Sequence, residues 1–154
     1  DTMVIYKHSV DSRDGCMARS RLGTEMEAHV IDRPEEIVTD GCRVVAIEEG
    51  QFFGDGLAPV VRRLLAEGAL VYVTGLNQDF RGEPFGVMPT LMALADELTL
   101  LTAICQKCHG VGTRTQRIID GEPAPWDSPL ILVGGGDFYE ARCPDCHDVP
   151  GRPD

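Results

Sequence analysis

Lysine is scarce in this chain, and long apolar runs are missing. Of the 14 basic residues only Lys7 and Lys107 are lysines, and neither follows a glycine. The sequence therefore contains no G-x-x-x-x-G-K-[ST] loop, the motif whose amides and lysine wrap the phosphates of a nucleotide. No apolar run approaches the roughly 20 residues that cross a bilayer, so we expect no association with a membrane.

Positive charge is also in deficit overall. The net charge is −11 across 154 residues, which would repel the phosphates of nucleic acid, so we expect no nucleic-acid partner. The length suits a core built from a sheet and helices. A hydrophobic content of 43% is ordinary for a globular protein.

The cysteines are few but regularly spaced. Cys105-Gln-Lys-Cys108 and Cys143-Pro-Asp-Cys146 are two CxxC motifs separated by thirty-four residues. Two such motifs in one short chain predict a closed, tetrahedral structural zinc site with four thiolate ligands, in preference to disulfides.

Four further residues bear on this prediction. Cys16 and Cys42 lie outside the two motifs, and we expect both to be free thiols. His109 and His147 each follow the second cysteine of a motif and could replace a thiolate. Four cysteines already complete a structural shell, however, so we do not expect a histidine ligand.

Apolar periodicity predicts an α/β fold. Residues 3–6, 43–47 and 70–74 are apolar, β-branched runs that are typical of strands buried on both faces. Between the last two runs, one face of a helix is formed by Leu57, Val60, Val61, Leu64 and Leu65. We expect Asp55 to cap the start of this helix and Gly68 its end. A strand–helix–strand unit of this size predicts a parallel sheet.

The remaining segments give weaker signals. Residues 11–30 are polar and contain glycine, which indicates a long loop, with a short strand over residues 27–30. We expect a second helix over residues 89–95, opened by its proline. Further strands are expected over residues 98–103 and 130–133.

Two acidic residues follow the strand over residues 43–47. Ligands of open α/β sheets bind beyond the carboxyl ends of the strands, which is where Glu48 and Glu49 lie. One carboxylate there could hold Mg²⁺ and the other could accept a proton from a substrate hydroxyl. The alternative is that both are solvated glutamates without a chemical role.

Phenylalanine is concentrated in the loops after these strands. Phe52, Phe53, Phe80 and Phe85 are four of the five phenylalanines of the chain. An aromatic slot beside carboxylates would suit a planar base, although loop aromatics also serve simply to fill a core.

Four longer motifs, in this order and together with both CxxC pairs, carry a resemblance. They are Ile47-Glu-Glu-Gly-Gln-Phe-Phe53, Thr74-Gly-Leu-Asn-Gln-Asp-Phe-Arg-Gly-Glu-Pro-Phe85, Thr113-Arg-Thr-Gln-Arg117 and Tyr139-Glu-Ala-Arg-Cys143. The chain closely resembles the type II thymidine kinases, the cytosolic and tetrameric class, from about Val4 to Pro150.

The resemblance implies an α/β core of the P-loop-kinase (RecA-like) type over residues 1–100, a zinc-binding lasso domain over 101–150 and a polar tail over 151–154. It implies transfer of the γ-phosphoryl group of ATP, with Mg²⁺, to the 5′-hydroxyl of thymidine, which yields dTMP in the salvage pathway. It also implies a cytoplasmic homotetramer with dTTP as a feedback inhibitor.

The resemblance implies roles for residues of the phosphate end as well. Glu49 matches the catalytic base, and Glu48 the position, usually Asp, that binds Mg²⁺. Gln51 falls in the segment that contacts the nucleotide. Asp11 and Arg13 match residues near the reacting phosphate.

A second group matches the nucleoside pocket. Its members line the pocket (Phe52, Leu76, Phe80, Phe85 and Tyr139), approach the 5-methyl group (Thr115) or hydrogen-bond the thymine edge through the backbone (Leu132, Val133 and Gly134). The last three lie in the lasso, which closes over the base and is fixed by the zinc ligands Cys105, Cys108, Cys143 and Cys146.

The sequence departs from the family at its start. The family begins with a strand, a phosphate-binding glycine loop and a helix, and none of these is found here. We expect that a segment of roughly 35–50 residues precedes the chain, the length of such a lead-in, and that the 154 residues by themselves are inactive. The alternatives are a non-catalytic zinc-ribbon interaction module and a fragment of another P-loop phosphotransferase.

Overall fold

The computed structural model describes residues 3–11, 15–19, 23–131 and 138–153, and the chain divides into two compact units. Unit 1 comprises residues 1–77 and 85–95, and unit 2 comprises residues 78–84 and 96–154. The short segment 78–84, which the sequence analysis counts with the α/β core, thus clusters with the cysteine-containing part of the chain.

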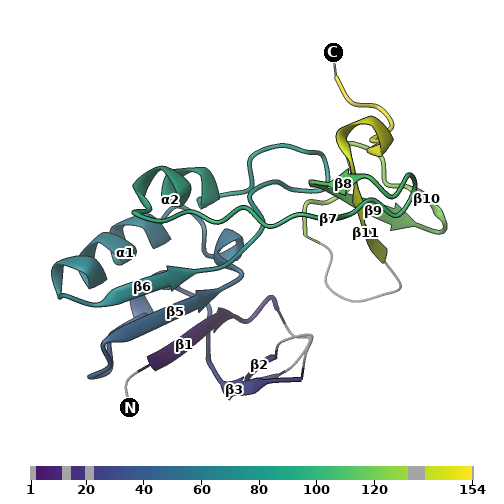
Figure 1. Cartoon of the computed structure of the whole chain (residues 1–154). Helices are drawn as coiled ribbons and strands as arrows, with labels where there is room; N and C mark the ends of the chain where they lie inside the picture. Colours follow the sequence, from purple (N-terminus) through teal and green to yellow (C-terminus); the bar gives the residue numbers. More distant parts are fainter. Residues whose placement is uncertain (1–2, 12–14, 20–22, 132–137, 154) are drawn as a thin grey trace. The chain divides into compact units, whose positions relative to one another are not determined.

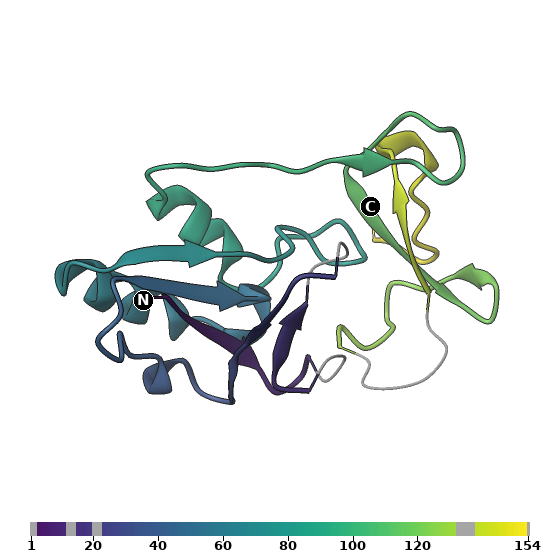
Figure 2. The ribbon, with the colours of Figure 1, turned by 60° about the horizontal axis from the view of Figure 1, so that its bottom comes forward.

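Unit 1 is built on a parallel sheet. Its strands are β1 (Met3–His8), β4 (His29–Ile31), β5 (Val44–Glu48) and β6 (Leu70–Val73), in the order β4-β1-β5-β6. They run side by side in both views (Figures 1 and 2). The predicted α/β class with a parallel sheet is confirmed.

The helices of unit 1 cover one face of this sheet (Figure 1). They are α1 (Leu57–Ala66) and α2 (Met88–Leu94). The side chains that α1 buries include Leu57, Val61 and Leu64, so the predicted apolar stripe is confirmed. The prediction that Asp55 caps the start of this helix is wrong: the N-cap residue is Gly56, and no side chain caps this helix end.

The segment expected to be a long loop contains regular structure. Strands β2 (Met17–Arg19) and β3 (Glu25–Glu27) pair antiparallel, and Ala28 N–H donates to the Cys16 carbonyl at 2.8 Å. The predicted strand over residues 27–30 is therefore divided between the last residue of β3 and the first two residues of β4. Two short 3-10 helices, η1 (Pro34–Glu36) and η2 (Gly50–Phe53), complete unit 1.

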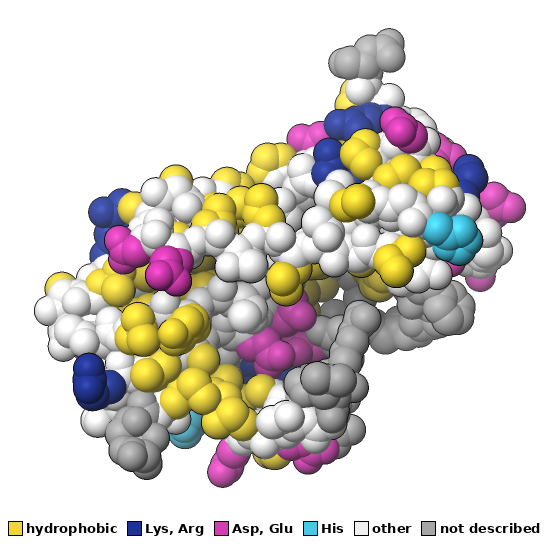
Figure 3. Space-filling view, in the orientation of Figure 1, with side chains coloured by type: hydrophobic (Ala, Val, Ile, Leu, Met, Phe, Trp, Pro, Cys, Tyr) yellow, Lys and Arg dark blue, Asp and Glu magenta, His cyan; other side chains and the backbone are white. Residues whose placement is uncertain are grey.

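The second face of the sheet has a different surface. Met3 on β1, Val30 on β4, and Leu70 and Tyr72 on β6 are each 40–56% exposed. Hydrophobic side chains gather over unit 1 in Figure 3. Parallel sheets are normally covered on both faces, and within the part of the chain that the structure describes this face is covered only in part, over Ile5 and Lys7.

Unit 2 consists of small antiparallel sheets. One has the order β10-β9-β11, with β9 (Arg114–Ile119), β10 (Glu122–Pro123) and β11 (Phe138–Arg142). The other pairs β7 (Ala103–Ile104) with β8 (Val111–Gly112). The 3-10 helix η3 (Pro144–Cys146) follows β11.

Two strands expected in unit 2 do not form as predicted. Of residues 98–103 only Ala103 lies in a strand, and Leu98, Leu100 and Leu101 are 52–88% exposed. A strand needs a neighbour for its backbone groups, and none of the described residues pairs with 98–102. In the second case, residues 130–131 are not in a strand, and 132–133 lie outside the described residues.

None of the helices in the described ranges is both long and apolar enough to cross a membrane. The longest of those given above, α1, has 10 residues. A spanning helix requires roughly 20 apolar residues. The helices of this fold serve instead to bury one face of the sheet.

Candidate functional site

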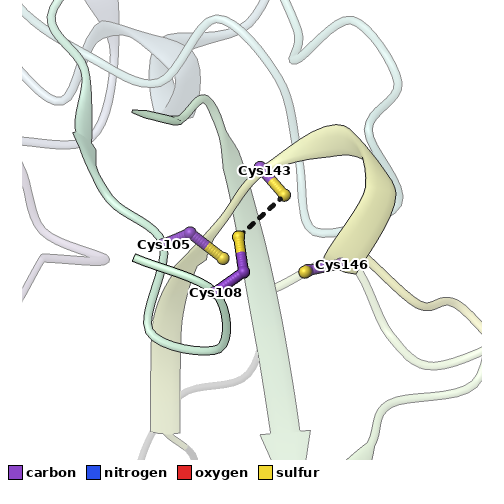
Figure 4. Close-up of side chains that lie close together, drawn as sticks. All are labelled: Cys105, Cys108, Cys143 and Cys146. Atoms are coloured by element: carbon purple, nitrogen blue, oxygen red, sulfur yellow. Dashed lines mark hydrogen bonds between the residues drawn. The ribbon is translucent and has the colours of Figure 1, made fainter. Parts of the chain in front are cut away.

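The four cysteines of the CxxC motifs converge in unit 2. Their sulfur atoms all lie within 4.8 Å of one another, and the Cys108 and Cys143 sulfurs are 3.6 Å apart (Figure 4). All six cysteines of the chain are free thiols, including Cys16 and Cys42 as predicted.

Main-chain hydrogen bonds place each pair of thiols. In the first motif, Cys105 N–H donates to Gly110 and His109 N–H to Cys105, at 2.8 and 2.9 Å. In the second, Cys146 and His147 N–H groups both donate to the Cys143 carbonyl. The β7–β8 hairpin holds the first motif, and η3 turns the second as β11 ends.

The two motifs are also joined to each other. Gln106 N–H donates to Ala141 at 2.9 Å, and Thr113 N–H donates to Arg142 at the same distance. A side chain at Gly112 would bring its Cβ to 3.2 Å from the Ala103 carbonyl, so glycine permits this close approach. Segments more than thirty residues apart thereby form one rigid base.

This donor set fits a metal ion. In a tetrahedral Zn–thiolate centre with bonds of about 2.3 Å, sulfur atoms are roughly 3.8 Å apart, close to the spacing found here. Burial alone would raise the pKa of Cys105, but main-chain N–H groups of Cys108 and Cys143 directed at its sulfur lower it to about 6. The neighbouring sulfurs, Cys143 foremost, raise the pKa of Cys146 to about 12. The lowered pKa favours the thiolate form of Cys105, which is the form in which sulfur binds a metal ion.

The histidines beside the motifs do not belong to the metal cluster. The Nε2 atom of His147 lies 2.9 Å from the Phe80 carbonyl. This contact engages the ring nitrogen and ties segment 78–84 to the second motif. His109 has a φ of 61°, the left-handed turn that closes the first motif. The expectation of an all-cysteine ligand set agrees with this arrangement.

In unit 1, the two glutamates lie where the sequence places them. Glu48 is the last residue of β5, and Glu49 follows with φ 52° and ψ 49°. A non-glycine residue in this left-handed conformation costs of order 1 kcal/mol or more and is common at functional sites. Its carboxylate accepts a hydrogen bond from Gln51 Nε2 at 2.5 Å.

The side chain of Gln51 links the two turns of this region by hydrogen bonds. It is 4% exposed, and its Oε1 atom accepts from Leu76 N–H at 3.1 Å while its amide donates to Glu49. A Cβ at Gly75 would collide with that Oε1, and one at Gly86 would lie 2.9 Å from the Gln51 carbonyl. Glycines therefore let the turns after β5 and β6 close around one buried amide.

A buried ion pair lies at the same end of the sheet and was missed from the sequence. Lys7 is 1% exposed, and its Nζ lies 3.3 Å from Asp11 Oδ2 and 3.4 Å from the Met17 carbonyl. Lys7 is the register partner of Glu48 on the adjacent strand. A lysine at the end of an apolar run was the available signal.

The phenylalanines of unit 1 pack against one another. Phe52 meets Phe85 edge to face at 6.0 Å between centroids, and Phe53 meets His8 at 5.0 Å. Phe53 and Phe85 are 5% and 7% exposed, so they contribute to the core as well as to any pocket. Leu76, at 42% exposed, is more open to a ligand.

Two of the predicted pocket residues of unit 2, Phe80 and Tyr139, contact the side chain of Arg117. Thr115 lies on β9, and Tyr139 on β11 is 53% exposed. Phe80 is only 3% exposed, with the Arg117 guanidinium 4.1 Å from its ring centroid. Arg117 occurs in a motif quoted above, but nothing in the sequence marks it as buried.

The predicted site residues are thus divided between the two units. Unit 1 holds the two glutamates, Gln51, Asp11, Phe52, Leu76 and Phe85, while unit 2 holds Phe80, Thr115, Tyr139 and the cysteines. Arg13, Leu132, Val133 and Gly134 lie outside the described residues.

Two comparisons relate the chain to known proteins. A family model described as thymidine kinase matches residues 1–147. A protein named thymidine kinase from Coprothermobacter proteolyticus is 48% identical over 152 residues, which cover 97% of this chain and 77% of that protein. The family match includes the glutamates at the end of β5 and all four clustered cysteines.

Proposed function

Because the chain belongs to the thymidine kinase family, we propose that it transfers the γ-phosphoryl group of ATP to the 5′-hydroxyl of thymidine. The observation that carries this proposal is the family match over residues 1–147, which contains Glu49 held by Gln51 at the end of a parallel strand. Neither a zinc-ribbon module nor an unrelated phosphotransferase would account for a match of this length.

In this proposal Glu49 is the general base. Its carboxylate accepts the proton of the 5′-hydroxyl as the oxygen attacks the γ-phosphorus and the bond to the leaving ADP breaks. The hydrogen bond from Gln51 helps to fix the direction in which the Glu49 carboxylate points. Such a base typically accelerates a reaction by about 10²–10⁴-fold.

The residue that would hold Mg²⁺ with ATP is Glu48, and Asp11 would lie near the reacting phosphate. Carboxylate oxygens suit this hard cation, which would neutralise negative charge on the phosphates. Lys7, paired with Asp11 at 3.3 Å and in register with Glu48, keeps carboxylates in place at the carboxyl end of the sheet. Arg13 is assigned to the reacting phosphate by resemblance alone.

Zinc is the metal we assign to the four cysteines, in a structural role. Thiolates at tetrahedral spacing prefer Zn²⁺, and four protein ligands leave no position for a substrate. The ion would make a rigid base from which residues 109–142 extend. Backbone groups at Leu132, Val133 and Gly134 can then read the thymine edge, with Thr115 near the 5-methyl group and Tyr139 beside the base.

Several finer properties complete the proposal by resemblance. They are Mg²⁺-dependent use of ATP, feedback inhibition by dTTP, assembly as a homotetramer and a place in the cytoplasm within nucleoside salvage. The 154 residues contain no G-x-x-x-x-G-K-[ST] loop, so we propose that by themselves they do not turn over ATP.

The decisive experiment measures nucleoside-dependent phosphoryl transfer. Radiolabelled γ-phosphate from ATP should appear in dTMP when thymidine and Mg²⁺ are present, using the natural protein isolated from its host. The 154-residue chain, expressed alone and purified away from host kinases, should bind thymidine without forming dTMP. A natural protein that neither binds nor phosphorylates thymidine would overturn the proposal.

A further inference from the structure

Arg117 heads the fully buried side chains in size among the described residues, and the function proposed above gives it no role. It is 2% exposed on β9. Its Nη1 and Nη2 atoms donate to the carbonyls of Pro129 and Leu130, at 2.5 and 2.7 Å, and its Nε donates to the Tyr139 hydroxyl at 3.0 Å. These three acceptors are all neutral.

Burying a guanidinium against neutral acceptors carries a desolvation cost. That cost is offset when the donors of the guanidinium all form well-directed hydrogen bonds. The planar fork of arginine donates in fixed directions, so it can hold two consecutive carbonyls and a third acceptor at once. The ring of Phe80 lies 4.1 Å from the guanidinium carbon and limits its movement. The hydrogen bonds and the Phe80 ring therefore both restrict the position of the Arg117 guanidinium.

A second arginine extends the same clamp. Arg81 Nη2 donates to the Ser128 carbonyl at 2.7 Å, and its guanidinium lies 5.1 Å from the Phe80 ring and 5.4 Å from the Trp126 ring. The three successive carbonyls at positions 128, 129 and 130 are thus each held by an arginine. Residues 128–130 owe their path to these side chains and not to a strand ladder.

The cysteines cannot substitute for this clamp. Along the chain, the cysteine nearest to Leu130 is Cys143, thirteen residues away. A metal ion bound by the cluster would fix both ends of the segment 109–142 between the motifs. Residues 128–130, which lie far from both ends, need a separate support. Arg117 joins that part to β9 on one side and to the phenol of β11 on the other.

We infer that Arg117 is a positioning residue for nucleoside recognition. It holds the arm formed by residues 128–130, and it orients Tyr139. This inference rests on the proposed function, in which Tyr139 lies beside the base. Arg117 itself touches no reacting atom, so its loss should weaken thymidine binding and base discrimination without altering the ATP side.

The test compares three variants of the protein. Arg117→Met keeps the apolar stem and removes every donor, and Arg117→Lys keeps the charge but loses the fork. The matched control is Arg114→Met, on the same strand, because within the described ranges the hydrogen bonds of the Arg114 guanidinium go to Thr113. The readouts are thymidine affinity by calorimetry, zinc content, and hydrogen–deuterium exchange of residues 124–131.

We expect both Arg117 variants to bind thymidine at least about tenfold more weakly, the order of one lost hydrogen bond to a charged group. Exchange should accelerate in residues 124–131 and stay unchanged around the cysteines, with zinc retained. In the variants that phosphorylate thymidine, KM for thymidine should rise while KM for ATP holds. Arg114→Met should match the parent in every readout.

Thymidine affinity within twofold of the parent in Arg117→Met would overturn the inference. So would loss of zinc in both Arg117 variants, because the residue would then serve the fold of unit 2 as a whole. If the parent protein itself binds no thymidine, the proposed function fails, and the exchange measurement still decides whether Arg117 holds the arm.

Discussion

At the scale of single residues, the buried amide of Gln51 joins the turns at the carboxyl end of the parallel sheet of unit 1. Glu49 adopts a left-handed conformation that an unconstrained glutamate would leave, and the hydrogen bond from Gln51 helps to keep it there. Strain of this kind is maintained only where the surroundings over-determine it. The glycines at positions 75 and 86 supply that constraint by admitting Gln51 to the space between two turns.

The first residue-scale prediction concerns the base. Glu49→Gln preserves shape and can still accept the hydrogen bond from Gln51, but it cannot take a proton. In the active enzyme, kcat should fall by about 10²–10⁴-fold while thymidine affinity changes little. Steady-state kinetics with calorimetry checks this, with Glu48→Gln as the matched variant. Near-normal turnover in Glu49→Gln and loss in Glu48→Gln would reverse the two assignments.

The second residue-scale prediction concerns Lys7. Lys7→Met removes one partner of an ion pair whose side chains are 1% and 7% exposed, so the free energy of unfolding should fall by about 3 kcal/mol. Asp11→Asn should partly rescue it, because the buried carboxylate that Lys7 faces is then replaced by a neutral amide. Urea denaturation of the single and double variants measures the coupling. Strictly additive losses would show that the two side chains do not stabilise each other.

At the scale of elements, short turns and hairpins position the chemistry more than long helices do. The β7–β8 hairpin and η3 each present two sulfurs, and two main-chain hydrogen bonds join the hairpin side to β11. Antiparallel strands as short as two residues have little stability of their own. A metal that ties them together would therefore contribute strongly to the folding of unit 2.

The element-scale prediction follows from that dependence. Cys108→Ser should reduce bound zinc from one equivalent to well below half, and hydrogen exchange should accelerate across β7–β8 and β11. The parallel sheet of unit 1 should keep its protection, because its core contains none of these cysteines. Metal analysis and exchange mass spectrometry measure both effects. The control is Cys16→Ser, an exposed free thiol that should leave zinc unchanged.

At the scale of the whole molecule, the two units have separate tasks. Unit 1 carries the carboxylates and unit 2 carries the cysteine cluster and the arginine clamp. Gln116, a buried polar side chain of unit 2, donates to and accepts from the Asp148 backbone at 2.8 Å. Rigid backbone groups of this kind suit discrimination between bases by hydrogen-bond pattern.

The whole-molecule prediction concerns that discrimination. Thymine offers an acceptor, an N3–H donor and another acceptor, and cytosine inverts two of these positions. Each buried group left unpaired costs about 1–3 kcal/mol, so deoxycytidine should be used at least about tenfold less well than thymidine, with deoxyuridine close to thymidine. Competition assays measure the ratios of kcat/KM. Equal use of deoxycytidine and thymidine would indicate a broad-specificity kinase instead.

Local patterns were sufficient for much of this protein. The apolar runs predicted β1, β5 and β6, and the helical stripe predicted α1, because burial of one face repeats with the period of the element. The CxxC spacing predicted the convergence of four cysteines, because a tight turn presents two thiolates whatever the rest of the fold is.

Other features were decided only by tertiary contacts. Residues 98–102 have a strand-like composition but no partner among the described residues, and a strand exists only as part of a ladder. Lys7 and Arg117 are charged residues that sequence rules place at the surface, yet both are buried. Asp11 and the Met17 carbonyl on β2 compensate Lys7, and the Tyr139 hydroxyl on β11 is one acceptor of Arg117. Composition and periodicity do not encode such pairings, since they depend on which distant segments the folded chain brings together.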